Sequence, residues 1–308
     1  MKLKKILIIK HGSLGDIVFS LPVIYSIKKH FYNEEVELLT EKKYFSFFKD
    51  SNYFNNLIED NRDKNLFINI NLLFTLKKNK YDLIIDLQNS FRTSIYNFFF
   101  RLFSKSKISS SRNFAHYKYN IPEQGRESTT QGLFNQIKLL NILSDNKIEY
   151  TWLEKKLDIK YDNKIVLFIP GVSSKGKYKQ WQPDKFANIA KYCESKNYKV
   201  CVVGNNSDRN SIAPILRACS NVIENIDNSP PDIIYSIAKK ASLVITNDTG
   251  PGHIASLSGT KILWILNDNK ITAANIGDKE NNLKLLSDSV KNITAIQVIE
   301  FINKQKLL

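Results

Sequence analysis

Short apolar runs alternate with amphipathic segments along most of this chain. Apolar runs bounded by polar turns are typical of strands that are buried on both faces. In the first half such runs cover residues 5–10, 36–40, 56–59, 81–87 and 107–109, and segments 16–30, 91–103 and 131–143 have the apolar spacing of helices. Strands that alternate with helices predict a parallel sheet covered on both faces. The first half is therefore predicted to be a doubly wound α/β domain.

The alternation lapses near the middle of the chain and then restarts. The polar stretch 144–162 is interpreted as the linker. Beyond it, strands are predicted at 164–169, 198–203, 221–224, 243–246 and 261–266, and helices at 183–195, 208–219, 230–240 and 293–308. We therefore expect a first domain over residues 1–155 and a second over 156–290. The terminal helix, about 290–308, is expected to pack back on the first domain.

The charge of the chain narrows the class of partner. It has 45 Lys and Arg against 30 Asp and Glu, which gives a formal net charge of +15. Such an excess attracts polyanions: nucleic acid, anionic lipid surfaces, or phosphorylated substrates. The sequence holds no nucleic-acid-binding signature, so we do not expect nucleic acid as a partner. A non-catalytic polyanion-binding protein remains an alternative from a different functional class.

Apolar run lengths and cysteine usage indicate the compartment. No run approaches the roughly 18–20 apolar residues that span a bilayer. The first run ends at Lys10 and is interpreted as a strand, not a signal peptide, so we expect a cytoplasmic protein. Cys193, Cys201 and Cys219 have no paired spacing and are expected to be buried thiols. The four histidines are scattered, so no metal site is expected.

The first candidate site is the sequence KHGSLGD at residues 10–16, directly after the first predicted strand. Its glycines make a tight turn with room beside the backbone. Asp16 stands at the start of the following helix, where the helix dipole favours a carboxylate. A carboxylate there can take a proton from an attacking hydroxyl as a general base. The alternative is that Asp16 only caps the helix.

The second candidate site is the loop that starts with PGVSS at residues 170–174. The hydroxyls of Ser173 and Ser174 and nearby backbone N–H groups can donate to phosphate oxygens, and Lys179 supplies positive charge. Trp181 favours a loop that is anchored to its domain. The alternative is a solvated Lys-rich loop.

The third candidate site is NDTGPGH at residues 247–253, between an apolar strand and a small-residue helix. The unpaired N–H groups of a helix start and the helix dipole attract anions. Asp248 or Thr249 can be the N-cap. Glu224, at the predicted carboxyl end of an earlier strand, is placed to bind a ribose hydroxyl. The alternatives are a well-capped helix start and an exposed acid in a turn.

Together these motifs resemble glycosyltransferase family 9, the bacterial heptosyltransferases of lipopolysaccharide core assembly. The resemblance rests on ILIIKHGSLGDIVFSLP, YDLIIDLQNSFRTS, PGVSS with KQWQPDKFANIA, and ITNDTGPGHIASLSG. It implies an α/β fold of GT-B type, in which two doubly wound, Rossmann-like domains face each other across a cleft. It also implies inverting, metal-independent transfer of a sugar from a nucleotide-diphosphate donor, typically ADP-heptose. No cofactor is then expected, because the nucleotide sugar is the substrate.

The resemblance assigns roles residue by residue. The implied catalytic residues are Asp16, as base, and Lys179. The implied donor contacts are Ser173, Ser174, Lys179, Glu224, Asp248, Thr249, Gly250 and His253, and the implied acceptor side holds Lys10, Gly15 and Arg92. Two positions depart from the family pattern. Phe19 stands where several heptosyltransferases have His, which affects the acceptor, and KQWQP has one residue more than the usual Lys-x-Trp-Pro, which affects the diphosphate loop.

The resemblance also implies the partner and its place. The expected acceptor is an anionic glycolipid of lipid A-Kdo type, met peripherally at the cytoplasmic face of the inner membrane. Two aromatic and basic clusters of the first domain, residues 42–48 and 98–103, can meet such a surface. The alternative is that these aromatic side chains are core. Another GT-B-like enzyme, either an epimerase or a transferase that uses a different nucleotide sugar, remains the nearest alternative function.

Overall fold

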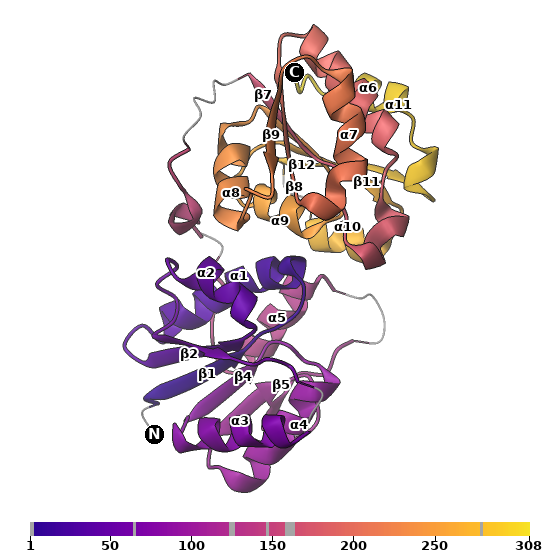
Figure 1. The fold of residues 1–308 in the computed structure, drawn as a ribbon. Helices are drawn as coiled ribbons and strands as arrows, with labels where there is room; N and C mark the ends of the chain where they lie inside the picture. The colour runs from indigo at the N-terminus through magenta and orange to yellow at the C-terminus, as the bar shows by residue number, and fades with distance from the viewer. Residues whose placement is uncertain (1–2, 64–65, 123–126, 146–147, 158–163, 278–279) are drawn as a thin grey trace. The chain divides into compact units, whose positions relative to one another are not determined.

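The computed structural model describes residues 3–63, 66–122, 127–145, 148–157, 164–277 and 280–308. The chain divides into two compact units, Met1–Glu149 and Tyr150–Leu308 (Figure 1). Each unit has its own sheet and its own apolar core. Among the described residues, no helix combines the length and the hydropathy that crossing a bilayer requires.

The first unit is built on a six-stranded sheet in the order β3-β2-β1-β4-β5-β6, with every neighbouring pair parallel. The strands are β1 (Lys5–Ile9), β2 (Glu35–Thr40), β3 (Asn56–Glu59), β4 (Leu83–Asp86), β5 (Lys107–Ser110) and β6 (Tyr117–Lys118). The helices are α1 (Leu14–His30), α2 (Phe45–Phe48), α3 (Leu66–Lys78), α4 (Phe91–Phe103) and α5 (Thr129–Lys138). Figure 1 shows α1 and α5 on one face of this sheet and α3 and α4 on the other.

The second unit repeats this plan, with the order β12-β11-β10-β7-β8-β9 and parallel pairs throughout. Its strands are β7 (Ile165–Ile169), β8 (Lys199–Gly204), β9 (Val222–Ile226), β10 (Leu243–Asn247), β11 (Ile262–Asn267) and β12 (Asn282–Ser287). Its helices are α6 (Pro183–Ser195), α7 (Arg209–Ala218), α8 (Pro231–Lys240), α9 (Gly250–Ser256), α10 (Lys270–Ile276) and α11 (Ala295–Lys304). Numbered within each unit, both sheets have the Rossmann order 3-2-1-4-5-6.

This shared order fixes where each unit can bind a ligand. In doubly wound sheets the ligand crevice lies outside the carboxyl ends of the strands, where the strand order reverses. The reversal falls between β1 and β4 in the first unit and between β7 and β10 in the second. The predicted fold class, two doubly wound α/β domains, is therefore confirmed. All three candidate loops of the sequence follow β1, β7 or β10.

The terminal helix contributes to the core of the second unit. Val298 and Ile302 of α11 are fully buried there, together with Phe186 of α6. That this helix also packs back on the first domain stays a prediction. The units divide between Glu149 and Tyr150, slightly before the expected boundary, because the segment that follows packs on α8: Lys155 N donates to Ser236 Oγ at 2.8 Å. The predicted linker, 144–162, lies partly outside the described residues.

Candidate active site

The loop after β1 is closed by a capping box at the start of α1. Ser13 is the N-cap, and both its backbone N–H and its hydroxyl donate to Asp16 Oδ2 at 2.8 Å. Gly12 has a φ of +115°, and a Cβ built there would lie 2.7 Å from the same Oδ2. Glycine is therefore required at this position for the carboxylate to fold back over the turn. In the part of the chain that the structure describes, Oδ1 of Asp16 makes no such bond.

Lys10 lies behind this carboxylate and is almost fully buried. Its Nζ donates to Leu87 O at 3.3 Å. Burial lowers the pKa of Lys10, while the carboxylates of Asp16 and Asp86 act in the opposite direction. A buried cation is thus held beside the turn, at the point where the strand order reverses. Gly15 is buried in the first turn of α1, and its role on the acceptor side stays a prediction.

Two residues that the sequence analysis missed hold the turn from a neighbouring strand end. Gly12 N donates to Glu41 Oε1 at 3.2 Å, and the Tyr44 hydroxyl donates to Gly12 O at 2.7 Å. Both residues follow β2, which pairs with β1. The rule that parallel strands end at one edge was a usable signal for them, because Glu41 comes directly after a strand that the sequence predicted.

Arg92 lies in the first turn of α4, at the same edge of the sheet. Its guanidinium donates to Asn69 Oδ1 at 2.9 Å and to the carbonyl oxygens of Arg62 and Asp63 at 3.0 and 2.8 Å. These bonds fix the segment that follows β3 against α4. That Arg92 contacts the sugar acceptor stays a prediction. In this structure its guanidinium binds backbone carbonyl groups of the protein itself.

In the second unit the structure brings three predicted residues together. Lys179 Nζ lies 2.5 Å from Asp248 Oδ2, and His253 Nε2 lies 3.1 Å from Asp248 Oδ1. Burial acts to raise the pKa of Asp248, but the bonds from His253 and Lys179 outweigh it and hold that pKa below its usual value. The loop after β7 and the turn after β10 are therefore joined by one carboxylate at the point of strand reversal.

Trp181 anchors the β7 loop, as the sequence predicted. The indole is fully buried, its backbone N–H donates to Asn247 Oδ1 at 3.0 Å, and Nε1 donates to Ile293 O at 2.8 Å. Asn247 Nδ2 in turn donates to Pro170 O at 2.8 Å. The loop is thus fastened at both of its ends, which argues against the alternative of a freely solvated segment.

The turn after β10 depends on close packing. Thr249 is the N-cap of α9 through its backbone, without a side-chain bond, and Gly250 is the first residue of the helix. A Cβ on Gly252 would lie 2.8 Å from Thr246 Oγ1 and 3.0 Å from Trp264 Cζ3. Only glycine lets the first turn of α9 approach β10 and β11 this closely.

Ser173 and Ser174 lie at the start of a short 3₁₀ helix, Ser174–Lys179, and both are exposed. Gly171, just before them, would place a Cβ 2.4 Å from the carboxylate of Asp208. Asp208 follows β8 and is buried, and its Oδ2 accepts from Asn205 N at 3.0 Å. Both serines thus lie exposed on the loop after β7, which also carries Lys179.

Glu224 is placed differently from its expected position. Strand β9 continues to Ile226, so Glu224 lies in the middle of the strand, in register with Val202 and exposed. It is not at a carboxyl end, because two further residues pair with β8. The structure instead places Asp208 after β8 and Asp227 after β9. Oδ1 of Asp227 accepts from Asn206 N at 2.8 Å.

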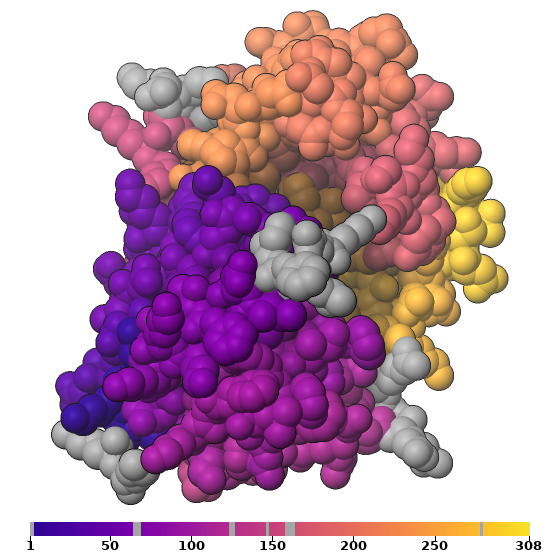
Figure 2. Space-filling model, turned by 60° about the horizontal axis from the view of Figure 1, so that its bottom comes forward, coloured from indigo at the N-terminus to yellow at the C-terminus, as the bar shows by residue number. Residues whose placement is uncertain are grey.

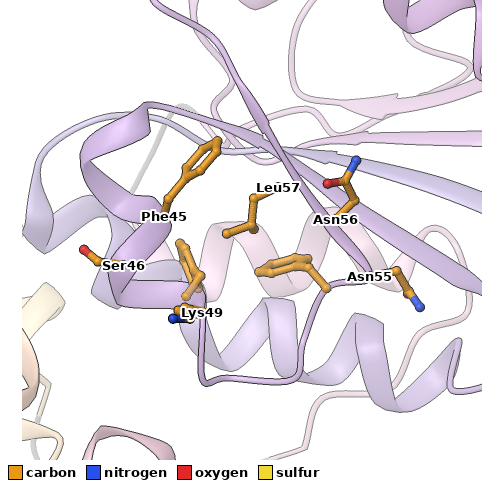
Figure 3. Close-up of a pocket in the computed structure, with 8 residues that line it drawn as sticks. Phe45, Ser46, Lys49, Asn55, Asn56 and Leu57 are labelled. Carbon is orange, nitrogen blue, oxygen red and sulfur yellow. The ribbon is translucent and has the colours of Figure 1, made fainter.

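A cavity of about 420 Å³ lies between α2 and the start of β3, lined by aromatic side chains together with Lys49 and Leu57 (Figure 3). It sits beside the amino end of the edge strand β3, whereas the loop that carries Asp16 follows the carboxyl end of β1. Among the described residues, no group of three or more His, Cys, Asp or Glu side chains is placed to hold a metal ion.

Comparison with known proteins yields matches of sequence and of fold. The profile of glycosyltransferase family 9 (heptosyltransferase) matches residues 70–265, a span that includes Lys179 and Asp248 and begins after Asp16. Lipooligosaccharide heptosyltransferase 2 of Campylobacter jejuni is 24% identical over 282 residues, which cover 87% of this chain and 83% of that protein.

Two solved structures share the fold over nearly the whole chain. A glycosyl transferase family 9 protein from Veillonella parvula has a TM-score of 0.78 at 18% identity and covers 99% of this chain and 98% of its own. The Escherichia coli heptosyltransferase WaaC, solved with ADP-2-deoxy-2-fluoro heptose, has a TM-score of 0.78 at 14% identity and covers 98% of this chain and 99% of its own.

Proposed function

The chain belongs to glycosyltransferase family 9 and is a glycosyltransferase of the heptosyltransferase type, and from this premise we propose that it transfers heptose from ADP-heptose to a lipopolysaccharide-core acceptor. The supporting observations are Asp16 at the start of α1 in the first unit and, in the second unit taken by itself, the Lys179–Asp248–His253 cluster. Each stands where the strand order of its sheet reverses. The name of the Campylobacter relative and the ADP-sugar ligand of the Escherichia coli enzyme support the choice of acceptor and donor.

The second unit is proposed to bind the donor. Ser173 and Ser174 are exposed on the same loop as Lys179, and we propose that their hydroxyl groups and its ammonium group together bind the diphosphate. Lys179 then exchanges part of its pairing with Asp248 for the phosphate oxygens. Its positive charge stabilises the negative charge that develops on the diphosphate as the bond to the sugar breaks. In other transferases a metal ion provides this stabilisation. We therefore propose a metal-independent reaction.

The first unit is proposed to supply the base. Oδ2 of Asp16 is used by Ser13, and the other carboxylate oxygen takes the proton of the acceptor hydroxyl as that hydroxyl attacks the anomeric carbon. Direct displacement by a single attacking oxygen inverts the anomeric configuration. We propose an anionic glycolipid of lipid A-Kdo type as acceptor, met at the cytoplasmic face of the inner membrane, because the net charge of +15 favours such a partner.

The test is a thermal-shift panel of ADP, UDP, GDP and CMP on the full chain. We expect a shift that is selective for ADP and that is lost in Lys179→Ala and in Asp248→Ala. Lys196→Ala, which removes an exposed cation of the same unit, is the matched control and keeps the shift. Selectivity for another nucleotide would overturn ADP-heptose as the donor, and no shift with any nucleotide would overturn the donor site.

A further inference from the structure

Helix α4 has two apolar faces, and only one of them is covered. Tyr96, Phe99 and Phe100 are buried in the core of the first unit. On the opposite side, at helical spacing, the exposed fractions are 80% for Phe91, 43% for Ile95, 44% for Phe98 and 57% for Leu102. Monomeric soluble proteins rarely expose a contiguous apolar stripe of this kind, so such a stripe marks an interaction surface.

The neighbouring helix extends the stripe. Phe74 of α3 and Phe103 of α4 are both about half exposed, and each lies next to the buried ring of Phe99, with ring centroids 5.1 Å apart. Lys77 Nζ lies over both exposed rings, at 6.0 and 5.8 Å from their centroids. We call the surface made by Phe74, Phe91, Ile95, Phe98, Leu102 and Phe103 the α3–α4 face. Figure 2 is turned so that the side of the first unit that carries α3 and α4 comes forward.

The surroundings of this face are strongly basic. Residues 66–122 hold 9 Lys and Arg and 2 Asp, so this segment alone carries 9 − 2 = +7 of the net charge of +15. Neither acid opposes the cations at the surface: Asp86 is fully buried, and Asp82 accepts the backbone N–H groups of Lys4 and Lys5. Exposed cations of this segment include Lys77, Lys78, Arg101, Lys105, Lys107 and Arg112. The partner that fits is anionic and offers an apolar layer beneath its charges.

We propose that the α3–α4 face docks the protein on an anionic phospholipid bilayer, with the phenylalanine and aliphatic side chains in the acyl boundary and the lysines and arginines at the headgroups. A second copy of this chain is a poorer fit, since two such faces would bring like charges together. The inference rests on the proposed function, in which the acceptor is a lipid-linked sugar.

The place of this face in the fold suits that role. Helix α4 starts directly after the carboxyl end of β4, at the sheet edge that also carries Asp16. Phe91, in its first turn, is therefore the member of the face nearest that edge, and the stripe runs away from it for about 20 Å along the helix. The two aromatic clusters of the sequence therefore differ. Tyr44, Phe47 and Phe48 are core, whereas the 98–103 cluster is divided between buried side chains, Phe99 and Phe100, and exposed ones, Phe98, Leu102 and Phe103.

The experiment is sedimentation of the full chain with vesicles of phosphatidylcholine alone and with added phosphatidylglycerol. We expect binding only to the anionic vesicles, and weaker binding as salt is raised. Arg101→Gln with Lys105→Gln should weaken it about fivefold for each cation removed. Phe91→Ser with Leu102→Ser should weaken it about tenfold or more. The controls are Lys240→Gln and Ile296→Ser, exposed positions of the second unit, and they bind as the wild type does.

Each outcome is decisive. The proposal is overturned if the wild-type protein does not bind anionic vesicles. It is also overturned if both double variants bind them as strongly as the wild type does. Light scattering could also show that the wild type is a dimer and that the Phe91→Ser and Leu102→Ser double variant is a monomer. That result would overturn the proposal and assign the face to self-association. The ADP thermal shift is measured on every variant: its retention shows a folded second unit, and its absence in the wild type would refute the proposed donor while leaving the vesicle result standing.

Discussion

At the scale of single residues, Asp16 has two roles that substitutions can separate. One carboxylate oxygen accepts two bonds from Ser13 and completes the capping box of α1. The proposed catalytic role uses the carboxylate as a base, and an amide of the same shape cannot perform it. Helix capping and proton transfer therefore depend on different properties of one side chain.

We expect Asp16→Asn to lower kcat by about 10²–10⁴ while the ADP thermal shift remains, because the amide still accepts from Ser13 but takes up no proton. Ser13→Ala is the matched control: it costs about 1 kcal/mol of stability as a lost cap and leaves most of the turnover. Turnover of Asp16→Asn close to that of the wild type would remove this residue from the role of base.

At the scale of elements, the turn from β10 into α9 in the second unit depends on close packing. Gly252→Ala places a methyl group against Thr246 and Trp264, which belong to two neighbouring strands and cannot move aside cheaply. We expect a loss of about 1–3 kcal/mol in the free energy of unfolding and a weakened ADP shift. Denaturant titration measures the first quantity.

Gly132→Ala in α5 is the comparison for that substitution. Its new Cβ would approach nothing nearer than Glu127 Oε2 at 3.8 Å, and alanine is favoured over glycine in a helix by roughly 0.5–1 kcal/mol. It should therefore be neutral or stabilising. Equal losses at both glycines would show that close packing at Gly252 is not the cause.

The sequence predicts strands and turns better than it predicts which helix packs against which sheet or core. The buried strands and the three loops that follow them are readable, because full burial demands unbroken apolar runs. Strand β12 escaped prediction because it is an edge strand of mixed burial, and an apolar stripe such as that of α11 does not indicate which core it enters. The bond between Tyr44 and Gly12 joins residues of different elements and has no local signature.

At the scale of the whole molecule, the chain divides its spectroscopic and reactive groups unequally. All three cysteines and all three tryptophans lie in the second unit, Tyr150–Leu308. Burial raises the pKa of Cys193 and of Cys201 to about 12 and that of Cys219 to about 11. The thiolate, which is the reactive form, is therefore scarce at any ordinary pH in the folded state.

We expect thiol reagents at pH 8 to label the native protein very slowly, and labelling to begin at the same urea concentration at which tryptophan emission changes. Both signals report on the second unit, whereas far-UV circular dichroism follows both units. At constant folding, raising the pH toward 11 should speed labelling of Cys219 first, since its pKa is the lowest of the three. Rapid native labelling at pH 8 would contradict the burial of these thiols.

The contact of Trp181 with Ile293 has a consequence for how this unit could be cut. The indole lies just before α6, the first helix of the unit, and its acceptor lies just before α11, the last. Their helices share one core, so α11 completes the packing around α6. Removal of α11 together with Ile293 would leave the buried indole N–H without its acceptor and would expose apolar side chains of that core. A version of the second unit produced by itself should therefore keep the chain through α11.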